Sequence, residues 1–337
     1  MNKKVVLPFE TQPFCICYHN LAFPFGVIQG NGNCNNVDVV SWMLRKFTNC
    51  VYDDSRELNR YEICLCDAWG VIDCLTTHQN INLFKSTYDI LGLDILSFMK
   101  KSINSNYYIT GSYNEKYIRV KNAYNSYDYW HDYIIYGYDD KKKCFYSAGF
   151  TGDEKYKGFE IPYNDFLLSV NNDSNKKIQF DLYAFNKNAP VKFNVIRITY
   201  LLRDYINSTT REGYRLNGFY GMKANEKLKE FFKNNHNPTV DLRYSRAHLE
   251  HKFFIRLAII SLSEKKYISL TKKQLELVES IYHKAKLIHM LGLKINMSKN
   301  FKLIDRIVEL FEDIEKTEKD LLPTIISILE QNLPDTV

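Results

Sequence analysis

The chain has 337 residues, a formal net charge of +6, 45% hydrophobic residues and 15% aromatic residues. This composition excludes a largely disordered protein, and the length predicts two domains. No segment approaches about eighteen uncharged apolar residues, so no membrane-spanning helix is expected. The apolar run from Val5 to Phe9 is too short for the core of a signal peptide. We therefore expect a cytoplasmic protein.

The cysteines are distributed unevenly. All eight lie in the first half of the chain, at positions 15, 17, 34, 50, 64, 66, 74 and 144. Without an export signal, these thiols are expected to be reduced rather than joined in disulfides. The sequence also changes character near residues 186–190. We therefore predict a first domain of residues 1–185 and a second of residues 191–337.

The first domain is expected to place its helices before its strands. A helix is predicted to start near Cys17 and to be broken by the Gly- and Asn-rich residues 29–36, and a second is predicted over residues 37–47. Apolar residues at helical spacing predict a third over residues 84–102. Short aromatic or β-branched runs predict strands at residues 107–110, 117–120, 133–138, 144–146 and 159–162.

Helical periodicity dominates residues 191–337, for which we predict five or six helices. Val195, Ile198, Leu201, Leu202 and Ile206 would form the apolar face of the first of them. The remaining candidates are residues 228–232, 247–262, 275–288, 301–310 and 321–331.

Residues 131–150 predict a β-hairpin that opens on His131, with Asp139 and Asp140 at its tip. A histidine at the start of a central strand can serve as the base that activates a cysteine thiol. Cys17 enters an apolar stretch shortly after Gln12. The pattern favours a cysteine–histidine acyl-transfer site, whereas the alternative is a buried structural cysteine and a hydrogen-bonded core histidine.

Several stretches resemble, in order, the butirosin biosynthesis protein H family. They are Cys17-Tyr-His-Asn-Leu-Ala, residues 60–70, 131–140 and 159–166, Tyr220-Gly-Met-Lys, and residues 249–252. The resemblance implies an α+β protein with a papain-like cysteine protease fold, made of helices plus an antiparallel sheet, followed by an all-helical C-terminal domain. It also implies an acyltransferase of nonribosomal peptide or polythioamide antibiotic biosynthesis. Such an enzyme would transfer an acyl group from the phosphopantetheine thioester of a carrier protein to a small amine, without a cofactor.

The resemblance implies Cys17 as the nucleophile and His131 as the general base. Cys15 is the main competitor, because residues two apart share one face of an extended segment. Cys34 is disfavoured by its place in the Gly- and Asn-rich insertion. Gln12 lies five residues before Cys17, near the position of an oxyanion-hole glutamine, although a solvated loop glutamine is the alternative.

A third group is expected to hold the imidazole of His131 in one tautomer. In peptidases similar to this family, an Asp or Asn about sixteen residues after the histidine has this role, but here Ser147 occupies that position. The candidates are therefore Ser147, Asp153 and Asp67.

Other binding chemistry is less favoured. The Cys15/Cys17/His19 and Cys64/Cys66 groups lack the spacing that structural zinc sites prefer, so no metal is expected. No phosphate-binding glycine loop is present, and no nucleic-acid motif accompanies the basic charge. Lysines gather at residues 141–143 and, at helical spacing, at Lys223, Lys227, Lys229 and Lys233. They predict a solvated face or a docking face for an acidic carrier protein.

Two rival functions remain open. A cysteine peptidase that cleaves a peptide or a leader would use the same Cys17 and His131. A non-catalytic binding or immunity protein on a decayed peptidase fold would explain the serine at position 147.

Overall fold

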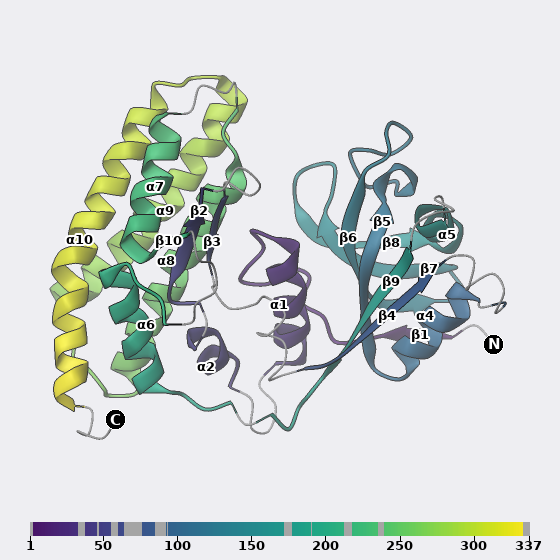
Figure 1. The fold of residues 1–337 in the computed structure, drawn as a ribbon, viewed down its shortest axis with the longest axis horizontal. Coiled ribbons are helices and arrows are strands. Elements are labelled where there is room, and N and C mark those ends of the chain that lie inside the picture. Colours follow the sequence, from purple (N-terminus) through teal and green to yellow (C-terminus); the bar gives the residue numbers. More distant parts are fainter. Residues whose placement is uncertain are drawn as a thin grey trace. The chain divides into compact units, whose positions relative to one another are not determined.

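The computed structural model describes residues 3–32, 38–45, 47–54, 60–63, 76–84, 92, 94–171, 177–189, 191–211, 218–234 and 239–332. The chain forms two compact units (Figure 1). Unit 1 contains residues 1–37 and 69–190, and unit 2 contains residues 38–68 and 191–337. Residues 38–68, which were predicted to lie in the first domain, therefore belong to the second unit.

Unit 1 is built on a seven-stranded antiparallel sheet with the strand order β4-β9-β5-β6-β7-β8, in which β1 also pairs with β6. Its strands are β1 Lys4–Val6, β4 Thr76–Phe84, β5 Tyr107–Asn114, β6 Trp130–Asp139, β7 Cys144–Phe150, β8 Tyr156–Pro162 and β9 Lys177–Phe185. The predicted hairpin is present as β6 and β7. Aromatic side chains fill much of the core, including the stacked rings of Tyr113 and Tyr133, whose centroids are 5.1 Å apart.

In the described residues of unit 1 the helices are α1 His19–Asn31, α4 Ile95–Asn104 and α5 Tyr163–Asn171, with a short 3-10 helix, η1, at Glu115–Tyr117. The predicted helix over residues 84–102 is wrong at Phe84 and confirmed from Ile95 onwards, whereas residues 85–91 and 93 lie outside the described residues. Phe84 ends β4, and the helix starts after Asp94, whose side chain accepts a hydrogen bond from the Leu96 N–H. The predicted strand at residues 117–120 is also wrong, because η1 and the turns after it occupy this segment.

Unit 2 contains six helices in the described residues and a small sheet. The helices are α2 Val39–Leu44, α6 Val195–Asn207, α7 Gly221–Lys233, α8 Leu242–Glu264, α9 Lys272–Ser298 and α10 Leu303–Asn332. The sheet has the order β10-β2-β3, formed by Gly218–Tyr220, Cys50–Asp53 and Arg60–Ile63. The C-terminal region is helical, as predicted, but an all-helical unit is contradicted by this sheet.

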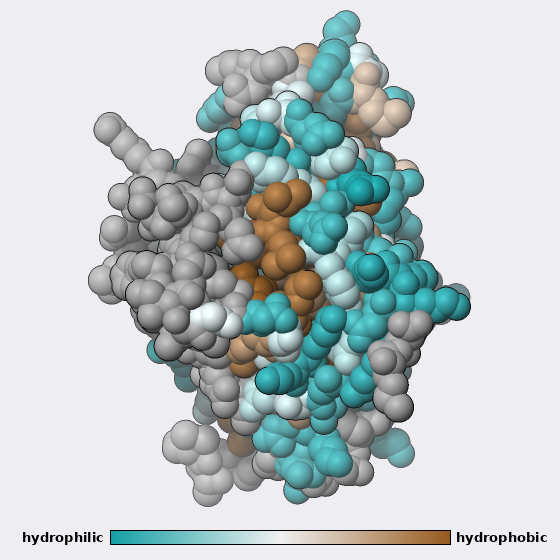
Figure 2. Space-filling model, turned by 90° about the vertical axis from the view of Figure 1, so that its right-hand side faces the viewer, coloured by the Kyte–Doolittle hydropathy of each residue, from teal (hydrophilic) through white to brown (hydrophobic). Residues whose placement is uncertain are grey.

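The fold as a whole is α+β with antiparallel sheets, which confirms the predicted class at that level. None of the helices in the described ranges has the length and apolar character needed to cross a membrane. On the face drawn in Figure 2, a central hydrophobic stripe lies beside mainly hydrophilic residues. Exposed apolar residues are common on protein surfaces, so the stripe alone does not identify an interface.

Candidate active site

The start of β6 brings His131 close to an acidic residue. In the β5–β6 register His131 lies opposite Tyr113, so the end of β5 and the following η1 reach back to the histidine. Glu115 in η1 places Oε1 2.9 Å from Nδ1 of His131. Because an ionised carboxylate only accepts hydrogen bonds, Nδ1 carries the proton, and Nε2 is left to accept one.

Glu115 also pairs with a buried lysine. Lys121 Nζ lies 3.2 Å from Glu115 Oε1 and donates a 2.6 Å hydrogen bond to the Phe150 carbonyl. Burial alone would raise the pKa of Glu115, but the hydrogen bond with His131 and the charge of Lys121 together lower it. Burial lowers the pKa of Lys121, against the opposing effect of Glu115. Glu115 is thus ionised at neutral pH and suited to stabilise an imidazolium at position 131.

A second imidazole packs against His131 from the first residue of α1. The ring centroids of His19 and His131 are 4.5 Å apart, and Phe23 and Phe150 stack on His19 at 5.0 and 5.6 Å. Neither ring nitrogen of His19 has a hydrogen-bond partner, although the residue is only 7% exposed. Burial and the charges of His131 and Lys121 hold its pKa well below the usual range. The start of α1 therefore lies beside the start of β6.

The candidate nucleophile precedes α1 by two residues. Two residues of chain span at most about 7 Å, so Cys17 remains close to His19. Its Sγ is 3.8 Å from Sγ of Cys15, and both cysteines are buried. The structure thus brings the two competing thiols together and does not choose between them.

The predictions for the group that orients His131 are wrong for Ser147 and Asp153. Ser147 pairs with Ile135, four residues along β6 from the histidine, which is about 13 Å at the usual rise of a strand. Asp153 lies in the β7–β8 turn and bonds to Thr151 and Lys157. Glu115 occupies the place that these residues were expected to fill.

The described residues do not include Asp67, Cys34, Cys64 or Cys66.

Glu115 was missed because the residue that orients His131 was sought after the histidine, whereas Glu115 lies sixteen residues before it. The strand predicted at residues 117–120 also separated the two strands that pair, β5 and β6, and so concealed this contact. Residues just after the first strand come beside the start of the second when the strands are antiparallel.

Gln12 is exposed, and its backbone N–H donates to Glu10 Oε1 at 2.8 Å. An exposed amide is poorly suited to an oxyanion hole, where donors act in a water-excluded site.

Asp139 lies at the hairpin turn, as predicted, and accepts hydrogen bonds from the N–H groups of Lys141 and Lys142.

No protein-family model and no curated protein matches this sequence. The resemblance to the butirosin biosynthesis protein H family, with the activity and partners that it implies, therefore stays a prediction.

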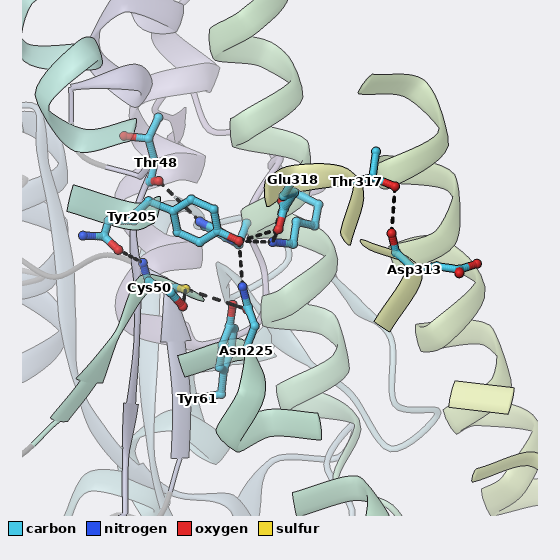
Figure 3. Close-up of polar contacts among 12 residues, drawn as sticks. Thr48, Cys50, Tyr61, Tyr205, Asn225, Asp313, Thr317 and Glu318 are labelled. Carbon is cyan, nitrogen blue, oxygen red and sulfur yellow. Dashed lines mark hydrogen bonds and ion pairs between the residues drawn. The ribbon is translucent and has the colours of Figure 1, made fainter. Parts of the chain in front are cut away.

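A second buried polar network lies in unit 2. Lys252 Nζ contacts both carboxylate oxygens of Glu318, at 2.8 and 2.9 Å, and the Tyr205 hydroxyl at 2.6 Å. Tyr205 donates to Glu318 and accepts from Asn225, which in turn accepts from Tyr61 (Figure 3). Lys252 and Glu318 are completely buried, so this ion pair has the character of a structural link between α8 and α10.

The predicted docking lysines already have acidic partners at several positions. Lys227 pairs with Glu230 at 2.8 Å, and Lys229 lies 3.5 Å from Glu315. Lys142, in the hairpin turn, pairs with Glu160. These ion pairs reduce the positive charge that either region presents to an acidic partner.

Buried histidines in unit 2 predict a loss of stability in mild acid. Burial, then the charge of Lys252, holds the pKa values of His248 and His251 well below the usual range, and burial beside Arg246 lowers that of His289 to about 4. The unfolded chain therefore takes up protons first as pH falls below about 6.5. We expect the free energy of unfolding to be highest near neutral pH and to fall from pH 7 towards pH 4.

Urea denaturation at pH 7, 6 and 5, followed by helical circular dichroism, tests this expectation. His289→Gln should lose less stability over the interval than the parent chain. An equal or steeper loss in the variant would remove His289 from the explanation.

Proposed function

We propose that the chain is a cysteine-dependent acyltransferase that forms an amide bond. The contact between His131 Nδ1 and Glu115 Oε1 carries the proposal, because it supplies an oriented base at the start of strand β6. The start of α1, two residues after Cys17, packs on the same imidazole. A helix start against a histidine-bearing antiparallel sheet is compatible with a papain-like arrangement, which we propose for unit 1.

In the proposed reaction, Cys17 gives its proton to Nε2 of His131 and attacks the carbonyl carbon of a carrier-protein thioester. A carbon–sulfur bond forms, the pantetheine thiolate leaves, and it takes the proton from the imidazolium. The amine then attacks the acyl-enzyme, His131 accepts a proton from its nitrogen, and the Cys17 thiolate leaves. Glu115 stabilises the imidazolium in both steps. The thioester is already activated, so amide formation needs no ATP.

The test is mass spectrometry of the protein after incubation with an acyl-pantetheine thioester. Without an amine, we expect one acyl group to be added to Cys17. With excess amine, we expect amide to appear and the adduct to disappear. Cys17→Ala should abolish both the adduct and the amide, whereas Cys15→Ala should keep them, because only one of these neighbouring thiols acts as the nucleophile.

Three results would contradict this proposal and favour another nucleophile or another function. An adduct on Cys15 that persists in Cys17→Ala would move the nucleophile. Free acid as the only product at saturating amine would favour the peptidase function. The absence of both adduct and product with a matched carrier thioester would favour a non-catalytic binding protein.

A further inference from the structure

A cavity of about 170 Å³ opens on the sheet of unit 1 beside the candidate active site. It is lined by Asn20, Phe23, Thr110, Gly111, Ser112, Asp132 and Asp181. The register explains why these polar residues meet. Ser112 of β5 pairs with Asp132 of β6, and Thr110 of β5 pairs with Asp181 of β9, so all four lie on one face of the sheet. Asn20 and Phe23 come from α1, which also carries His19.

The cavity is acidic at both its mouth and its interior. Asp132 and Ser112 are exposed, whereas Asp181 and Thr110 are buried, with exposed fractions of 9% and 5%. Burial raises the pKa of Asp132, the charge of neighbouring His131 opposes this, and the charge of Asp181 raises the pKa further. The two carboxylates therefore repel one another, and a cation between them would relieve that repulsion.

A second observation points independently to a ligand. The hydroxyl of Thr110 is buried and has no hydrogen-bond partner, although it lines the cavity. An unpaired buried hydroxyl is costly, and a donor group placed in the cavity would satisfy it. Phe23 supplies an apolar surface beside these polar groups.

We infer that this cavity is a binding site for a small organic cation with a protonated amine. The ammonium group lies between Asp132 and Asp181 and donates to the Thr110 hydroxyl, while the alkyl part of the ligand packs on Phe23. A cavity of about 10 to 15 Å³ measured in the same way holds one water molecule, so this cavity has room for a small organic ligand. A single bare metal ion would leave most of this space unfilled.

This site would hold a cationic part of the acceptor in the proposed acyl transfer, but binding itself needs neither Cys17 nor turnover. An ammonium held by two carboxylates stays protonated and is a poor nucleophile. The attacking nitrogen would therefore be a different atom of the same ligand. The inference and the proposed activity can fail separately.

The test is a ligand-observed NMR titration of the Cys17→Ala protein with butylamine, which is protonated at pH 7, and with butanol as its neutral analogue. We expect butylamine to bind and butanol to bind at least about tenfold more weakly. Asp181→Asn should weaken butylamine binding about tenfold or more. Asp132→Asn changes an exposed residue, so it remains a usable variant if Asp181→Asn does not fold.

Asp128→Asn is the matched control, because Asp128 is an exposed carboxylate of the same unit that pairs with Lys116 away from the cavity. It should bind butylamine as the parent does. Equal affinity for butylamine and butanol would overturn the inference. So would unchanged butylamine binding in both Asp132→Asn and Asp181→Asn, or an equal loss in the Asp128→Asn control.

Discussion

Replacing Lys252 with methionine is expected to lower the free energy of unfolding of unit 2 by about 3 to 5 kcal/mol. The ammonium contacts both oxygens of Glu318 and the Tyr205 hydroxyl, and neither charged side chain is exposed to solvent. Methionine fills a similar volume but leaves the Glu318 carboxylate buried without its counter-charge. Urea denaturation at pH 7, followed by helical circular dichroism, measures the difference.

Two further variants separate burial of charge from loss of packing. Lys319→Met, one residue after Glu318, removes an exposed lysine that pairs with Glu315 and should cost less than about 1 kcal/mol. The double variant Lys252→Met/Glu318→Leu should recover most of the stability lost in Lys252→Met, because no unpaired charge remains. A loss below about 1 kcal/mol in Lys252→Met would mean that the pair is not buried as described.

The second large effect is expected at the candidate base. If His131 moves the protons of acyl transfer, His131→Ala should slow amide formation by about 100-fold or more. Glu115→Gln should slow it by about 10- to 100-fold, because a neutral amide replaces a charged hydrogen bond to the imidazole. Single-turnover assays with an acyl-pantetheine thioester and excess amine measure both changes.

The matched control for these variants is Asp153→Asn. This surface carboxylate bonds to Thr151 and Lys157, and its replacement should leave the rate unchanged. Because Glu115→Gln also deprives buried Lys121 of its acidic partner, the unfolding midpoint must be measured in parallel. A normal rate in Glu115→Gln, or a slow rate in Asp153→Asn, would return the orienting role to the residues after the histidine.

The local spacing of apolar and charged residues was sufficient to predict much of this fold. The β6–β7 hairpin was predictable because two apolar runs flank a short charged turn, and α8 and α9 were predictable from their helical spacing. The three-residue strand β10 gives almost no local signal, and it pairs with β2 far away in the sequence. The helices predicted over residues 301–310 and 321–331 are one continuous helix, α10. It continues through Pro323, although proline usually breaks a helix, because packing around the helix outweighs that effect.

The candidate site was predictable in part for the same reason. His131 is marked by its place at the opening of a hairpin, which is a local feature. Its contact with Glu115 depends on β5 and β6 pairing in one register, and its contact with His19 depends on where α1 packs. The pairing of Thr110 with Asp181 joins strands β5 and β9, so the acidic cavity also had no short-range signal.

The passage of the chain between its two units has a consequence for biosynthesis. Residues 38–68 belong to unit 2, but the chain then builds most of unit 1 before it returns at residue 191. Strand β2 therefore leaves the ribosome long before its partner β10 exists, a delay on the order of 10 s at ordinary rates of translation. During that interval β2 presents an unpaired edge to the surroundings. Unit 1 is complete once residue 190 has been synthesised, whereas unit 2 has to keep its early strand β2 available until β10 emerges.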